Sequence, residues 1–208
     1  MSKVLRDLHN MNILLPSVLF EEKLIIKGAS RSVELYCLGG GHSPSDTFMY
    51  LPTEKIAFMG DLITKDLHVP IYDSTEFLSI LQVVKQMDIE MMVPGHGGIG
   101  RMAMCNTILD YLSLLIQRAT EAHHSKITRE DFIADFEIPI QYQQWQGVNG
   151  IKANLSKVYT DLQPTRKRPC KRGPFNVTKV DKIAIIADSM TKITARIATT
   201  DARTINYF

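Results

Sequence analysis

The sequence has few of the residues that stabilise small secreted domains. Its 208 residues include three cysteines and one tryptophan. Cys37, Cys105 and Cys170 are an odd number without Cys-x-x-Cys spacing, which argues against both a zinc ribbon and a disulfide framework. We expect reduced thiols. Cys37 falls in a predicted strand and Cys105 in a predicted helix, where buried packing is the simpler interpretation.

Long apolar runs are also missing. None approaches the roughly 20 residues that a membrane-spanning helix requires. The first residues have no hydrophobic signal region, because Arg6 and Asp7 stand close behind Met1. We therefore expect a cytoplasmic protein that has no membrane partner. A content of 45% hydrophobic and 22% charged residues is typical of a globular domain.

Charge is distributed unevenly along the chain. Residues 164–208 hold ten of the 24 basic and three of the 22 acidic residues, a net charge of +7, which leaves −5 for residues 1–163. The sequence thus predicts a domain over 1–163, followed by a basic linker and tail over 164–208. Apolar spacing from Val180 to Ile197 is compatible with an amphipathic helix. The basic run 166–172 lacks interleaved aromatics, which favours a solvated linker over a nucleic-acid site.

Short apolar runs in the first half predict a meander of strands. Asp73, with Glu76 three residues later, forms a capping-box pattern that predicts the start of a helix. This helix, lying between two strands, predicts a parallel crossover. The predicted strands are 18–20, 24–26, 33–38, 48–51, 56–59 and 89–93, and the further helices are 101–124, 128–136 and 148–162.

Three polar side chains follow apolar runs on glycine-rich turns. His42 lies in Gly-Gly-Gly-His-Ser-Pro-Ser-Asp, Asp61 in Met-Gly-Asp, and His96 in Pro-Gly-His-Gly-Gly. Imidazole and carboxylate groups are ligands that zinc accepts, and strand ends can direct them to one point. This pattern predicts a metal site. Asp46 either orients the His42 loop from outside the ligand set or is a simple turn residue.

These motifs resemble the second half of the metallo-β-lactamase superfamily of hydrolases, over about residues 15–162. The resemblance implies an α/β (α+β) fold, a partial αββα sandwich with a helical C-terminal part. It also implies one or two zinc ions held by His42, Asp61 and His96, with Asp61 bridging them and serving catalysis. His68 would lie in a loop over the site, where it either touches substrate or is an exposed residue without a role.

One family motif does not occur in this sequence. The upstream His-x-His-x-Asp-His, which supplies further ligands in the family, is absent, and only His9 precedes His42. Two interpretations follow: a zinc hydrolase with impaired activity in this chain alone, or a non-catalytic module. A further N-terminal segment or a second chain would supply the missing half. We also expect an uncovered apolar sheet face, which favours self-association or a partner. The small-molecule substrate stays open.

Overall fold

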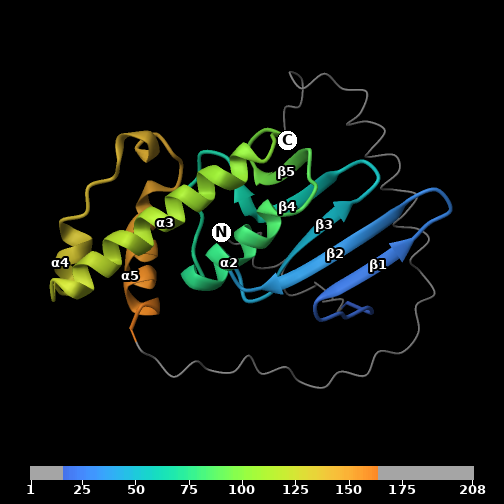
Figure 1. Cartoon of the computed structure of the whole chain (residues 1–208). Coiled ribbons are helices and arrows are strands. Elements are labelled where there is room, and N and C mark those ends of the chain that lie inside the picture. The colour runs from blue at the N-terminus through green and yellow to red at the C-terminus, as the bar shows by residue number, and fades with distance from the viewer. Residues whose placement is uncertain (1–15, 164–208) are drawn as a thin grey trace, which may run out of the picture.

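The computed structural model describes residues 16–163, and the predictions for residues 1–15 and 164–208 lie outside this range. Five strands form one sheet in the order β1-β2-β3-β4-β5 (Figure 1). The strands are β1 Lys23–Lys27, β2 Ser32–Gly39, β3 Asp46–Leu51, β4 Ile56–Thr64 and β5 Met91–His96. The mixed α/β architecture expected from the sequence is confirmed.

Strands β1 to β4 form an antiparallel meander, whereas β4 and β5 pair in parallel. Helix α2, Ser74–Lys85, connects these last two strands and begins at Asp73, whose side chain accepts hydrogen bonds from the backbone of Thr75 and Glu76. The predicted crossover is therefore correct. Because β4 and β5 run in the same direction, Asp61 and His96 come to the same edge of the sheet.

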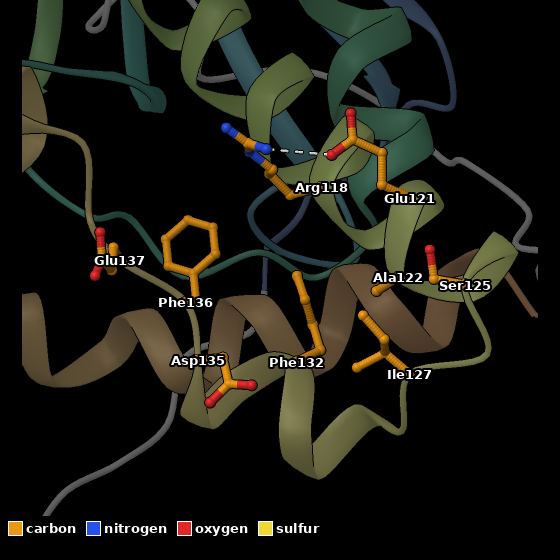
Figure 2. Close-up of a pocket in the computed structure, with 9 residues that line it drawn as sticks. All are labelled: Arg118, Glu121, Ala122, Ser125, Ile127, Phe132, Asp135, Phe136 and Glu137. Atoms are coloured by element: carbon orange, nitrogen blue, oxygen red, sulfur yellow. Dashed lines mark hydrogen bonds and ion pairs between the residues drawn. The ribbon is translucent and has the colours of Figure 1, made fainter.

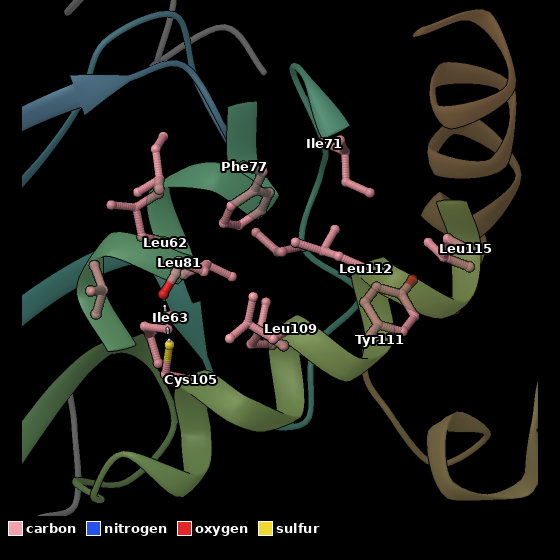
Figure 3. Packing of buried hydrophobic residues seen from close by; sticks show 14 of the residues in the cluster. Leu62, Ile63, Ile71, Phe77, Leu81, Cys105, Leu109, Tyr111, Leu112 and Leu115 are labelled. Atoms are coloured by element: carbon pink, nitrogen blue, oxygen red, sulfur yellow. Dashed lines mark hydrogen bonds between the residues drawn. The ribbon is translucent and has the colours of Figure 1, made fainter. Parts of the chain in front are cut away.

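Helices cover one face of the sheet. Helix α3, Ala103–His124, packs on α2 and β4, and α5, Ile151–Asp161, packs on α3 on the side away from β1 (Figure 1). The core between helices and sheet is well filled, and Phe77, Leu81 and Leu112 have no exposed surface (Figure 3). Cys105 is buried there, as predicted, and burial raises the pKa of its thiol to about 11.

The opposite face of the sheet carries a second, smaller apolar cluster. Its buried members are Val33, Leu51 and Ile56. The side chains packed around them are only half-buried: Ile26, Leu35, Met49, Phe58, Met91 and Val93. Alternation along the strands, with Phe48 and Tyr50 on the helix side and Met49 and Leu51 on this side, gives the sheet two apolar faces.

Several boundaries differ from the sequence expectation. The largest difference is at β4, which continues to Thr64 instead of ending at residue 59, so that Asp61 lies within the strand. Residues 18–20 are not a strand, and Leu19 is 45% exposed, because three apolar residues alone do not distinguish a strand from a loop. Helix α4, Arg129–Ala134, is shorter than predicted, and α5 is preceded by short 3-10 turns at Ile140–Tyr142 and Val148–Gly150. No helix within residues 16–163 is long and apolar enough to cross a membrane.

Candidate metal centre

His42, Asp61 and His96 lie together at one edge of the sheet. His42 Nε2 is 3.4 Å from Asp61 Oδ2, and His96 Nε2 is 3.5 Å from Asp61 Oδ1. Two ligands of one tetrahedral zinc ion, with bonds near 2.1 Å, are separated by roughly 3.4 Å. Each histidine nitrogen therefore stands at ligand spacing from a different oxygen of the same carboxylate.

Glycines allow the strands to bring Asp61 into this position. Gly60 has φ +53°, and the pairing of β4 with β5 shifts register around it, so the chain turns just before the carboxylate. Gly95 passes so close to β4 that a Cβ atom there would collide with Asp61 Oδ1 and the backbone of Gly60. The Gly-Asp and Pro-Gly-His patterns thus reflect the close approach of two strands.

The orientation of the His42 ring is fixed by one hydrogen bond. Nδ1 lies 2.9 Å from the carbonyl oxygen of Pro70. Because a carbonyl oxygen only accepts, Nδ1 carries a proton in this contact, and Nε2 is the ring nitrogen that faces Asp61. The 3.4 Å between Nε2 and the carboxylate oxygen is the spacing of two ligands of one cation.

Asp46 organises the loop that carries His42. The residue is 8% exposed, and its carboxylate accepts from the backbone N–H groups of Gly41 at 2.8 Å and His42 at 2.7 Å. It also accepts from the backbone N–H of Ser43 at 3.0 Å and from the Ser43 hydroxyl at 2.5 Å. These bonds satisfy three successive backbone donors, so Asp46 does more than occupy a turn.

Glu76 has a function in this loop that the sequence pattern did not predict. The capping-box pattern expects its carboxylate to return to the backbone of Asp73. It accepts instead from the backbone N–H of Gly40 at 2.9 Å, 36 residues away in the sequence. Helix α2 therefore holds the loop that carries His42. The spacing of residues near Glu76 does not predict this contact, because Gly40 is distant in the sequence.

Solved structures with a related fold superpose on this chain. The stereoselective inverting sec-alkylsulfatase Pisa1 from Pseudomonas sp. matches with a TM-score of 0.59 and 17% identity, over 88% of this chain and 33% of its own. A double mutant of this sulfatase gives 0.59 and 16%, over 91% and 32%. A metallo-beta-lactamase from Pontibacter korlensis gives 0.44 and 26%, over 53% and 54%.

This chain has part of the metallo-β-lactamase fold. It spans about a third of the sulfatase and about half of the lactamase. No model of a protein family matches the sequence, and no curated protein does either. The fold predicted from the motifs is thus confirmed by three-dimensional similarity.

In this metallo-β-lactamase fold His68 is not the exposed loop residue that we expected. It is 2% exposed, Tyr111 donates its hydroxyl to Nδ1 at 2.9 Å, and Nε2–H donates to the Tyr142 carbonyl at 3.0 Å. The ring packs between Tyr111 and Trp145, each with its centroid 5.5 Å away. With both nitrogens bonded and almost no exposed surface, His68 is not placed to touch substrate, and burial lowers its pKa.

A groove of about 480 Å³ lies elsewhere, between α4 and the C-terminal half of α3 (Figure 2). Phe132, Phe136 and Ile127 supply apolar surface, and Arg118 pairs with Glu121 across 3.2 Å. None of its lining residues comes from the loops of His42, Asp61 or His96. The groove is therefore separate from the candidate metal centre.

The chemical types of the three side chains suit zinc, but their positions do not surround a single ion. Two imidazoles and a carboxylate are suitable ligands. As the side chains stand, however, no group of three or more His, Cys, Asp and Glu in residues 16–163 is arranged to hold one ion. The distances and this result agree, because the two histidines face different oxygens of Asp61. The Asp61 carboxylate thus lies between two possible ion positions, one beside His42 and one beside His96.

Proposed function

We propose that this chain carries part of the zinc site of a metal-dependent hydrolase, with His42, Asp61 and His96 as ligands. The observation that carries the proposal is the pair of Nε2 to Oδ distances, 3.4 and 3.5 Å, on opposite oxygens of Asp61. The fixed Nδ1–H of His42 supports it, since it presents Nε2 as a metal ligand.

Each residue has a distinct part in this proposal. Asp61 would bridge the two histidine positions, and the side chains of Asp61 and His96 are 37% and 61% exposed, open to a substrate. Asp46 would hold the His42 loop rigid. A bound zinc ion would supply Lewis-acid polarisation and activation of water for hydrolysis.

Further ligands would come from another polypeptide segment, which we propose to dock on the open face of the sheet. That face offers the half-buried side chains Leu35, Met49, Phe58 and Val93, a surface complementary to a second apolar sheet. The occupant would be a β-sheet segment bearing the missing histidines. Without it, three ligands bind zinc weakly, because each lost ligand lowers the binding free energy.

Zinc titration of the full chain by calorimetry tests the ligand proposal. We expect measurable binding in the unmodified chain and an affinity lower by more than about 100-fold in Asp61→Ala, beyond the effect of losing an outer partner of a ligand. Asp88→Ala is the matched control, since Asp88 has a 72% exposed side chain that pairs with Lys55 instead. Equal affinities of the chain and Asp61→Ala would refute the proposal.

A non-catalytic binding module is the second candidate. It is favoured by the absence, in residues 16–163, of a group arranged to hold an ion as it stands. Hydrolysis of a generic ester with added zinc separates the two candidates. Turnover that is lost in Asp61→Ala supports the hydrolase, whereas zinc binding without turnover, even with a docked partner sheet, supports the module.

A further inference from the structure

Asn154, near the start of α5, contacts the chain on both sides of Pro70. Its Oδ1 accepts from the backbone N–H of Ile71 at 3.1 Å, and its Nδ2–H donates to the carbonyl oxygen of Val69 at 2.9 Å. The residue is 3% exposed. A buried amide with both ends bonded to one short segment acts as a clamp on that segment.

The clamp and the candidate metal centre share a single peptide group. The carbonyl of Pro70 and the N–H of Ile71 belong to the same planar peptide bond, which is trans because residues 16–163 contain no cis peptide bond. In a trans peptide the C=O and N–H point in opposite directions. Asn154 holds the N–H end, and the carbonyl end accepts from His42 Nδ1 at 2.9 Å on the other side.

We propose that Asn154 is a positioning residue for His42. By holding the 70–71 peptide, it directs the Pro70 carbonyl at Nδ1, keeps the proton on that nitrogen and leaves Nε2 facing Asp61. Its importance for metal binding rests on the proposed function, but its effect on the His42 tautomer does not. Helix α5 thereby reaches the candidate centre through residues 69–71.

Other contacts anchor the same loop and allow Asn154 to be tested without removing the loop. Nearby, His68 is fixed by Tyr111 and Tyr142, and its backbone N–H donates to the Gln146 carbonyl at 2.9 Å. On the other side, the N–H of Tyr72 donates to the Gly41 carbonyl at 2.8 Å. Loss of the clamp should therefore free the 70–71 peptide while the loop keeps its course.

Nitrogen NMR of the metal-free full chain, labelled in histidine, reads the tautomer directly. Spectra are recorded at about pH 8.5, where an ordinary imidazole is neutral, and His42→Gln assigns the signals. In the unmodified chain and in Asn154→Asp, which keeps an acceptor for Ile71 N–H, we expect the proton on Nδ1. In Asn154→Leu, which has no acceptor, we expect the two ring nitrogens to shift toward a mixture of tautomers.

Val158→Ala is the control for a merely structural effect, because Val158 is fully buried on the same helix and makes no bond to residues 69–71. It should lower the melting temperature and leave the His42 signals unchanged. An unchanged tautomer in Asn154→Leu, or the same change in Val158→Ala, would overturn the proposal.

Cobalt(II) titration adds a second readout, with affinity expected to fall about tenfold in Asn154→Leu. If the unmodified chain binds no metal, the proposed function fails, and the NMR result still decides this inference.

Discussion

Two histidines near Pro70, His42 by a hydrogen bond and His68 in the sequence, have opposite environments. Each donates one ring N–H to a backbone carbonyl, His42 to Pro70 and His68 to Tyr142. The remaining nitrogen of His42 faces Asp61, whereas that of His68 accepts from Tyr111. A histidine with one free, directed nitrogen can bind a metal, and one with both nitrogens bonded in a closed cluster stabilises the fold.

The two histidines also differ in how deeply they are buried. The His42 side chain is 23% exposed, and His68 is 2% exposed among aromatic rings. Burial lowers the pKa of His68 and raises the pKa of Tyr111 to about 12, so the hydroxyl keeps its proton and donates it. Substitutions in the two regions should therefore affect different properties, stability at His68 and metal binding at His42.

The largest expected effect is that of His68→Ala. It leaves a cavity and two unpaired polar groups, and we expect it to lower the free energy of unfolding by about 3 kcal/mol. His42→Ala removes a single hydrogen bond at a partly exposed side chain, for which we expect about 0.5–1 kcal/mol. Urea denaturation measures both. Equal losses would mean that the two regions do not differ as described.

Asp46→Ala should have the next largest effect on the free energy of unfolding. It removes the acceptor of the backbone N–H groups of Gly41, His42 and Ser43, and we expect a loss of about 2 kcal/mol in unfolding free energy, since charged hydrogen bonds are the stronger class. Asp46→Asn keeps one acceptor oxygen and should lose less. Calorimetric melting of both variants tests the ranking, and an Asn variant as unstable as the Ala variant would contradict it.

Tyr111→Phe should have a smaller effect confined to the closed cluster. It removes only the hydroxyl that donates to His68 Nδ1, which should cost about 1–2 kcal/mol by leaving a buried acceptor unpaired. Zinc affinity should not change. Tyr72→Phe is the control, because Tyr72 is 49% exposed, and its unfolding free energy should stay within about 0.5 kcal/mol of the unmodified chain.

The smallest expected effect is a pH dependence from His68. Its pKa is lowered in the folded state, so the unfolded chain binds more protons once the pH falls below the ordinary value of about 6.5. The stabilising contribution is therefore complete above about pH 6.5 and declines as the pH falls through the folded-state value, by at most about 1.4 kcal/mol per pH unit. Urea denaturation at several pH values measures it. Relative to His68→Gln, the unmodified chain should lose stability on acidification, and parallel curves would exclude His68 as the cause.

Local patterns in the sequence were sufficient to predict much of this molecule. The strands of the meander, the crossover helix after Asp73 and the glycine-rich turns at His42, Asp61 and His96 depend on neighbours a few residues apart. Periodicity and turn chemistry act over that range. The fold and the grouping of these three residues could therefore be anticipated, whereas their role as ligands stays a prediction.

Contacts between distant residues decided the rest. The bond of Asn154 to Ile71 spans 83 positions, that of His68 to Tyr142 spans 74, and that of Glu76 to Gly40 spans 36. The sequence identified Asp61 and its two histidines because apolar runs and glycines mark them locally. Only the packing of α5 and α3 against the loop after β4 determined that His68 is enclosed and that Asn154 holds the peptide facing His42, because such contacts depend on which distant surfaces meet.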